Sequence, residues 1–119
     1  MLSNNQKRRY SRQIVLPEVG EEGQLKLANA SVLVIGAGGL GCPVLQYLAA
    51  VGVGKIGIAD FDKVDISNLQ RQVLFAEENI GQSKAETAKN KIQAMNSLIE
   101  VIAYDLEVNA DSVLSLIEP

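Results

Sequence analysis

The residues with the clearest chemical signature are three glycines. Gly36, Gly38 and Gly41 have the spacing Gly-x-Gly-x-x-Gly, directly after the apolar run 32–35 and directly before a helical stretch. In this pattern the first glycine permits a tight turn, the second lets a phosphate approach the backbone, and the third lets the helix pack against the strand. Free N–H groups and the helix dipole then favour a bound anion. The segment therefore predicts a phosphate-binding loop.

A carboxylate follows at the place where a ribose is commonly held. Asp60 lies 19 residues after Gly41 and closes the apolar segment 55–59, which is typical of a second strand. A carboxylate there accepts hydrogen bonds from ribose hydroxyls. The alternative is a glycine turn that only packs, with Asp60 as a solvated strand end. Loop, strand and acid together favour a nucleotide, and a NAD(P)-dependent oxidoreductase is one class that this pattern fits.

The segment after Asp60 is dense in amides and charges. Asn68 and Arg71 are three residues apart, so one helical turn points them the same way. A guanidinium holds phosphate oxygens in a two-pronged contact, and Lys84 adds a point charge at the start of a predicted helix. Taken singly, Asn68 is equally a helix cap and the two cations are ordinary surface charges. Taken together they favour ATP, because a triphosphate needs more donors and cations than a dinucleotide.

The composition limits the remaining classes. The 119 residues are 47% hydrophobic and 21% charged, which predicts one modest domain with a real core. A net charge of −3 argues against general nucleic-acid binding. The chain has no histidine and a single cysteine, Cys42, so it has no histidine-dependent catalysis, intrachain disulfide or cysteine zinc site of its own. We interpret Cys42 as a packing residue and not as a nucleophile.

The N-terminus has no apolar core like that of a signal peptide, and no stretch approaches the roughly 20 apolar residues of a membrane-spanning helix. These features predict a cytoplasmic protein without a membrane partner.

The predicted elements alternate between strand and helix. Strands are expected at 32–35, 55–59 and 101–104, helices at 21–28, 42–51, 83–96 and from Asn109 to Pro119, a polar helix or arm at 4–12, and a brief extended piece at 14–17. The run 32–35 is apolar throughout, as in a strand covered on both faces. Ser83 to Glu86 has the form of a capping box, and the buried stripe of that helix is predicted to comprise Ala85, Ala88, Ile92 and Met95.

This order predicts an α/β fold. We expect the first half of a Rossmann-like, doubly wound, mostly parallel sheet over residues 30–119, preceded by an N-terminal helical arm over residues 1–29. The first strand normally lies at the centre of such a sheet. Here its apolar edge would be exposed and prone to aggregation. We therefore expect the natural protein to continue beyond residue 119, or another chain to cover this edge.

Several separated motifs resemble the ThiF/MoeB/HesA family, whose members are related to the adenylation half of ubiquitin-activating enzymes. The resemblance runs in register from about residue 8 to the end of the chain. The motifs that carry it are Arg9–Gln13, Gly36–Cys42, Asp60–Asp62, Ser67–Gln72 and Gly81–Lys84.

The resemblance implies an ATP-dependent adenylyltransferase. In the family, the C-terminal glycine carboxylate of a ubiquitin-like sulfur-carrier protein attacks the α-phosphate of ATP and gives an acyl-adenylate and pyrophosphate. Sulfur transfer then supports thiamine, molybdenum-cofactor or related biosynthesis. Positioning and neutralisation of phosphate charge carry this chemistry, so the absence of a histidine base is consistent with it.

The resemblance also assigns roles to residues of this chain. It implies a homodimer in which Arg12 reaches into the partner's site and acts there with the catalytic cations Arg71 and Lys84. The nucleotide-binding residues that it implies are Gly36, Gly38, Gly39, Gly41, Asp60, Asp62, Asn68, Arg71 and Lys84.

Other parts of the family's machinery are expected beyond residue 119. They are the aspartate that binds Mg²⁺, the Cys-x-x-Cys pairs that hold Zn²⁺, and the surface that docks the carrier. No metal ligand is therefore assigned in this chain, which alone is expected to bind ATP at best, without turnover. A non-catalytic chain that only dimerises with an active one is the third hypothesis, suggested by the incomplete sheet.

Overall fold

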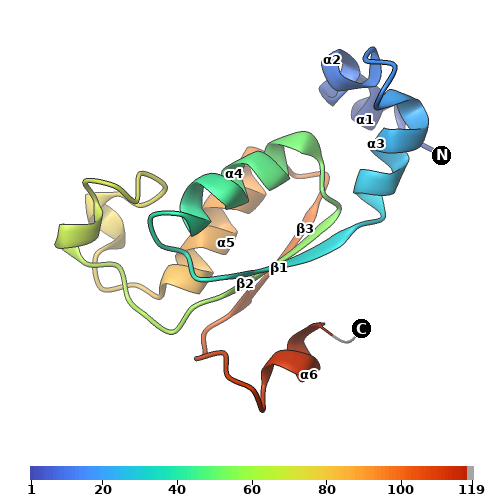
Figure 1. The fold of residues 1–119 in the computed structure, drawn as a ribbon. Coiled ribbons are helices and arrows are strands. Elements are labelled where there is room, and N and C mark those ends of the chain that lie inside the picture. Colours follow the sequence, from blue (N-terminus) through green and yellow to red (C-terminus); the bar gives the residue numbers. More distant parts are fainter. Residues whose placement is uncertain (118–119) are drawn as a thin grey trace.

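The fold is a three-stranded parallel sheet with helices packed against it. A computed structural model describes residues 1–117. The strands are β1 (Ser31–Ile35), β2 (Lys55–Ala59) and β3 (Glu100–Tyr104), in the order β1-β2-β3. Their last residues, Ile35, Ala59 and Tyr104, pair in register, so all three strands end at one edge of the sheet. This confirms the predicted Rossmann-like α/β class (Figure 1).

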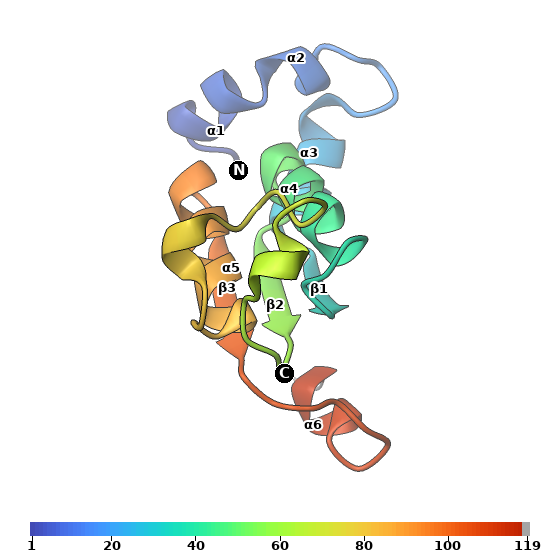
Figure 2. The ribbon, with the colours of Figure 1, turned by 90° about the vertical axis from the view of Figure 1, so that its left-hand side faces the viewer.

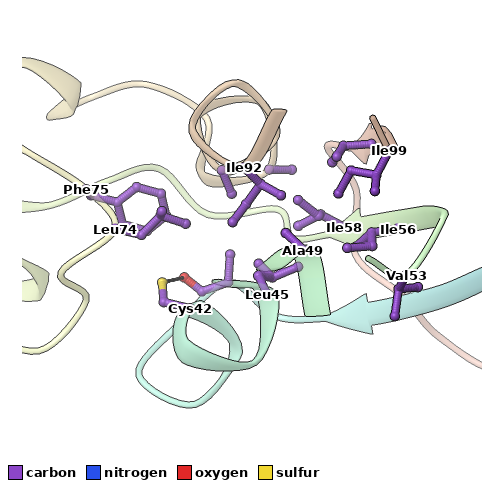
Figure 3. Close-up of a cluster of buried hydrophobic side chains, with 14 of the residues drawn as sticks. Cys42, Leu45, Ala49, Val53, Ile56, Ile58, Leu74, Phe75, Ile92 and Ile99 are labelled. Carbon is purple, nitrogen blue, oxygen red and sulfur yellow. Dashed lines mark hydrogen bonds between the residues drawn. The ribbon is translucent and has the colours of Figure 1, made fainter. Parts of the chain in front are cut away.

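The two crossover helices cover one face of the sheet. They are α4 (Gly41–Val51) and α5 (Lys84–Met95), and both lie above the strands in Figure 1. Their apolar sides meet the strands in a core that contains Leu45 of α4, Ile58 of β2 and Ile92 of α5, none of which has exposed surface. Figure 3 shows these three side chains pointing into the space between the helices and the strands. Burial of each contributes about 1.5–3 kcal/mol and holds the helix ends that carry the candidate site.

The opposite face of the sheet is largely open within residues 1–117. Residues 32–34 are half-buried, and Ile35 is 59% exposed. The expectation that this strand is covered on both faces is therefore wrong for the described part of the chain, because both crossover helices pack on the same face. Of the elements that the structure describes, only α6 (Val113–Ile117) approaches the open face, across a cavity of about 360 Å³ lined by Val32, Leu33, Gly57, Ile102, Tyr104 and Leu116, among others.

The first 29 residues form an arm of three short helices. They are α1 (Asn4–Arg9), α2 (Ser11–Ile14) and α3 (Gly20–Ala28). The arm lies beyond the amino ends of the strands, opposite the glycine loop, and is the distant, faint part of Figure 2. The division of the chain after residue 29 stays a prediction.

The extended piece predicted at 14–17 is wrong. Ile14 is the last residue of α2, and the chain continues in turns in which the Gly20 N–H donates to the Leu16 carbonyl at 3.0 Å. Local bonds of this kind satisfy the backbone without a strand partner.

Three details of the helices α5 and α6 differ from the sequence-based expectation. Ser83 caps α5 by accepting the Glu86 N–H at 3.3 Å, while the reciprocal bond of a capping box is not among those of residues 1–117. Met95, the last residue of α5, is 41% exposed and not part of the buried stripe. Asn109 caps a turn before α6, and residues 118–119 of the predicted last helix lie outside the described residues.

Two short helical turns interrupt the polar segment that follows β2. They are η1 (Ile66–Asn68) and η2 (Glu77–Asn79). No helix in the described part of the chain has the length and apolar character needed to cross a bilayer.

Candidate functional site

The glycine loop joins β1 to α4 at the carboxyl edge of the sheet. Gly36 has φ +94°, a conformation that favours glycine, and its N–H donates to the Ala59 carbonyl at 2.8 Å. A Cβ on Gly41 would lie 1.9 Å from the Gly36 carbonyl oxygen. The first glycine therefore makes the turn, and the third lets α4 start directly against it.

The middle of the loop presents backbone donors that the protein does not use. Among residues 1–117, the N–H groups of Gly38, Gly39 and Leu40 donate to no protein acceptor. They stand at the N-terminus of α4, which has no acidic residue in its first turn and no side-chain cap. Free N–H groups and the helix dipole point at the same space, which suits a phosphate.

Asp60 is fixed beside this loop by two backbone donors. Its Oδ2 accepts the Ala37 N–H at 2.7 Å, and its Oδ1 accepts the Asp62 N–H at 2.8 Å. Each carboxylate oxygen keeps acceptor capacity for a further donor such as a ribose hydroxyl. Asp62 itself is exposed, next to this carboxylate.

Arg71 lies directly against the loop. A Cβ on Gly39 would be 3.7 Å from Arg71 Cδ, so the aliphatic part of the arginine packs over that glycine. Its guanidinium is exposed, and among residues 1–117 it makes only a 3.5 Å contact, from Nη1 to the Ser67 carbonyl. Most of its five N–H donors are therefore free for an anion above the loop.

Asn68 serves as a cap and keeps its donors. Its Oδ1 accepts the Asp65 N–H at 3.1 Å and so completes the capping box of η1. Its backbone carbonyl accepts the Arg71 N–H at 3.2 Å, which ties the arginine to the same turn. Asn68 is therefore a helix cap, as the alternative interpretation of the sequence predicted. Its Nδ2 makes no hydrogen bond within residues 1–117 and is available for a ligand.

Lys84 reaches this edge through main-chain pairing that the sequence does not reveal. Lys63 and Ser83 form an antiparallel bridge, and the Lys84 N–H donates to the Asp62 carbonyl at 3.0 Å. The side chain is buried, with 6% of the residue exposed, and its ammonium has no salt bridge or hydrogen bond to any of residues 1–117. The ammonium nitrogen is not among the buried polar atoms that lack a partner in residues 1–117, so it keeps contact with solvent and can meet an anion that enters the site.

The positive charge of Lys84 affects the pKa of two groups at the site, Asp65 and Cys42. Hydrogen bonds from the Ser67 hydroxyl and N–H hold the pKa of Asp65 below its ordinary value, and the Lys84 ammonium adds to this effect. The same ammonium also acts on Cys42, at the start of α4, where burial has the larger and opposite effect on the thiol. The Lys84 ammonium is therefore within electrostatic range of both the start of α4 and the polar segment after β2.

Gln72 is a residue of this site that the sequence reasoning did not single out. It is 3% exposed, its Oε1 is buried without a partner among the described residues, and a Cβ on Gly38 would lie 3.7 Å from its Nε2. It was visible only as a member of the motif that ends the segment 67–72. An amide between two exposed residues gives no periodic signal of burial.

Arg12 is the predicted site residue that the fold keeps apart. It lies on α2 in the arm, beyond the amino ends of the strands (Figures 1 and 2). The glycine loop lies at the other ends of the strands. The other predicted residues, from Gly36 to Lys84, meet at the carboxyl edge. Within one copy of this chain, Arg12 does not belong to that group.

Cys42 is predicted to be unreactive in the folded protein. Its Sγ donates to the Ala37 carbonyl at 3.3 Å (Figure 3), and burial raises the pKa of the thiol to about 11. At pH 8 only about one thiol in 1,000 is therefore a thiolate, the form that reacts. We expect no carbamidomethylation by iodoacetamide over an hour at pH 8, and complete labelling in urea, measured by mass spectrometry. Rapid labelling without urea would show that the thiol is accessible and activated.

Comparison with known proteins places the site in a family context. A family model described as the ThiF family matches residues 10–119. The chain is 50% identical over 111 residues to a sulfur carrier protein adenylyltransferase of Thermus thermophilus, covering 93% of this chain and 41% of that protein. It is 51% identical over 117 residues to an adenylyltransferase and sulfurtransferase MOCS3 of Culex quinquefasciatus, covering 98% of this chain and 27% of that protein.

Solved structures agree with these relatives. The E. coli tRNA N6-threonylcarbamoyladenosine dehydratase TcdA, in complex with ATP, superposes with a TM-score of 0.90 at 30% identity. The match covers 98% of this chain and 47% of TcdA. The chain thus spans less than half the length of each protein that it matches here.

Proposed function

The chain belongs to the ThiF family, and we propose that it carries the ATP-binding part of an adenylyltransferase that activates a ubiquitin-like sulfur-carrier protein. Its relatives include a sulfur carrier protein adenylyltransferase and an adenylyltransferase and sulfurtransferase. The chain spans 41% and 27% of their lengths, so the activity of the whole protein is part of the proposal. The proposal also includes a role in thiamine, molybdenum-cofactor or related sulfur-transfer pathways, and a cytoplasmic location.

The observation that carries the proposal is the mostly buried side chain of Lys84, whose ammonium forms no ion pair within residues 1–117, together with the free donors of the loop. The loop supplies unused N–H groups and Arg71 packs over Gly39. The Lys84 ammonium is within electrostatic range of Cys42, at the start of α4, and of Asp65. Two cations and several amides around one space suit a group with several negative charges. A dinucleotide pyrophosphate carries fewer negative charges, so the second cation favours ATP over NAD(P).

The chemistry assigned to this site is displacement at phosphorus. A carboxylate oxygen of the carrier attacks the α-phosphorus, the bond to the bridging oxygen of the β-phosphate breaks, and pyrophosphate leaves with the electron pair. Arg71, Lys84 and the loop N–H groups would offset the charge that develops on the phosphate oxygens. Asp60 would hold the ribose with Asp62 beside it, and Asn68 would donate through Nδ2. No proton needs to move, because the attacking carboxylate is already ionised.

Mg²⁺ would accompany ATP, and its protein ligand is expected beyond residue 119. No cluster of three or more acidic or cysteine residues suited to a metal lies within residues 1–117. Zn²⁺ is proposed for the full-length protein only.

Arg12 is proposed to serve the site of a second copy in a homodimer. The fold separates it from the glycine loop of its own chain, while its exposed guanidinium has no ion pair among residues 1–117. This separation and this free guanidinium support a contribution to a partner's site.

The proposal is tested with the full-length protein and a sulfur-carrier protein. We expect carrier-dependent exchange of labelled pyrophosphate into ATP, and tighter binding of ATP than of NADH in parallel titrations. A clear preference for NADH would support the oxidoreductase alternative. Binding of ATP without any exchange would support the non-catalytic dimerisation partner.

The 119-residue chain alone is predicted to be inactive in the same assay. It has the loop and both cations but not the proposed Mg²⁺ ligand or carrier-docking surface. We expect no pyrophosphate exchange above background, with ATP binding as the positive control for folding. Robust exchange by these 119 residues would show that they hold a complete catalytic site.

A further inference from the structure

The structure assigns a positioning role to four side chains that join the arm to the body of the domain. We infer that Tyr10, Gln13, Gln24 and Asn96, here called the arm latch, hold the segment that carries Arg12 in the orientation needed to reach a second copy. This inference rests on the proposed function, in which Arg12 acts in a partner's site. Its new content is the set of residues that aims Arg12.

The arm cannot hold its own shape. Helix α1 has six residues and α2 has four, and isolated helices of that length are unstable in water because nucleation is unfavourable. Neither helix contains a buried residue. The orientation of Arg12 in α2 therefore depends on contacts between the arm and the rest of the chain.

The first half of the latch joins Tyr10 to the end of α5. Tyr10 is 3% exposed, and its hydroxyl oxygen accepts a hydrogen bond from Asn96 Nδ2 at 2.8 Å. Asn96 has no exposed surface, and its Nδ2 also donates to the Ala49 carbonyl at 2.8 Å, while its Oδ1 accepts the Leu98 N–H at 3.0 Å. The fully bonded amide thus connects the arm with the last turns of α4 and α5.

The second half of the latch joins α2 and α3 to the end of α4. Gln13 Nε2 donates to the Val51 carbonyl at 2.9 Å and to Gln24 Oε1 at 2.5 Å. Gln24 has no exposed surface, and its Nε2 donates to the same Val51 carbonyl at 3.0 Å. The last carbonyls of a helix lack intrahelical partners, so these amides satisfy groups that would otherwise be orphaned.

Close packing around Gly52 restrains the latch in addition to its hydrogen bonds. Gly52 ends α4 with φ +94°, and a Cβ there would lie 2.6 Å from Tyr10 Cζ and 2.7 Å from Gln24 Nε2. Arg9 Nη1 donates to the Met95 carbonyl at 3.2 Å, a further tie to the end of α5. A bound and tightly packed base limits the movement of the side chain that it carries.

Arg12 lies between the two latch residues of its own segment. Tyr10 and Gln13 are three positions apart and face the body, so Arg12 points elsewhere and is exposed. A shift of about 1 Å in a positioned group is enough to lower a catalytic rate by about 100-fold. Loosening the latch is therefore expected to act like partial loss of Arg12, in the partner's site and not in the chain's own.

The test uses mixed dimers of the full-length protein. A chain with Arg71→Ala has a defective site and an intact arm, and a chain with Arg12→Ala has the reverse. Mixed in equal amounts, they should recover about a quarter of the wild-type pyrophosphate exchange, because half of the dimers are mixed and one of their two sites is complete. The latch variant Tyr10→Phe with Gln13→Leu is then added to one chain or the other.

We expect the latch variant to lower activity only when it is placed in the chain that supplies the arm. In the Arg71→Ala chain, which supplies the arm, the latch variant should lower the recovered activity at least about tenfold. In the Arg12→Ala chain, which supplies the site, it should change little. The matched control is Lys7→Gln, which removes an exposed 3.7 Å ion pair with Glu21 in the same arm and should have no effect in either chain. Equal loss from both chains, or no loss, would overturn the inference.

A second measurement separates failure of the latch from failure of the proposed function. Hydrogen exchange of residues 4–14 should be about tenfold faster in the Tyr10→Phe, Gln13→Leu variant, with residues 31–35 unchanged, because Asn96 Nδ2 loses its bond to the arm and the buried Gln24 Oε1 loses its donor. Unchanged exchange in the arm would exclude the latch. Absence of complementation between Arg71→Ala and Arg12→Ala, with the arm exchanging faster as expected, would refute action in the partner's site and with it the aiming of Arg12, and leave only a structural latch.

Discussion

Replacing Arg71 by alanine is expected to weaken ATP binding by about 10- to 150-fold. This range corresponds to about 1.5–3 kcal/mol for hydrogen bonds to a charged group. Within the described part of the chain the guanidinium has only a 3.5 Å contact with the Ser67 carbonyl, so little of its bonding capacity has to be given up when phosphate binds. Calorimetric titration of the full-length variant with MgATP measures the change directly.

The fold of that variant should be unaffected, because Arg71 is exposed. The matched control is Lys26→Ala, which removes one positive charge from an exposed i,i+4 ion pair with Glu22 in the arm. It should leave the dissociation constant for ATP unchanged and the unfolding temperature within experimental error. Unchanged affinity in Arg71→Ala would count heavily against the triphosphate site.

Replacing Gly41 by alanine is expected to lower the free energy of unfolding by about 3 kcal/mol or more and to abolish ATP binding. The new Cβ would lie 1.9 Å from the Gly36 carbonyl oxygen. Backbone atoms cannot move aside as a flexible side chain does, so the start of α4 has to separate from the loop. Chemical denaturation and ATP titration of the same sample measure the two effects.

Gly38→Ala is the matched control in the same loop. A Cβ there would meet only Gln72 Nε2 at 3.7 Å, an ordinary contact. We expect the free energy of unfolding to change by less than about 1 kcal/mol, while ATP affinity falls at least about tenfold, because the methyl group lies where a phosphate must approach the backbone. Equal stability of the two alanine variants would refute the packing role of Gly41. Full ATP affinity of Gly38→Ala would refute the close approach.

The sequence predicted the loop well because its determinants are local. The spacing of Gly36, Gly38 and Gly41 fixes a turn and a close helix start, and Asp60 follows at the end of the neighbouring parallel strand. Parallel strands in register bring these two segments together whatever lies between them. The strands and both crossover helices followed from apolar runs and capping residues for the same reason.

The position of Lys84 could not be predicted in that way. It depends on an antiparallel bridge between Lys63 and Ser83 and on the bond from the Lys84 N–H to the Asp62 carbonyl. Long-range pairing of irregular segments leaves no periodic pattern. The arm posed the same difficulty, because the turns after Ile14 and the burial of Gln24 depend on polar contacts with the end of α4. Buried amides look like surface residues in a sequence.

The most direct test of the central claim is a structure of this chain determined with bound ATP. The account predicts phosphate oxygens within hydrogen-bonding distance of the Gly39 N–H, with the Arg71 guanidinium and the Lys84 ammonium both in contact with the same triphosphate. Phosphates bound away from residues 36–41, or a triphosphate that neither cation contacts, would contradict it.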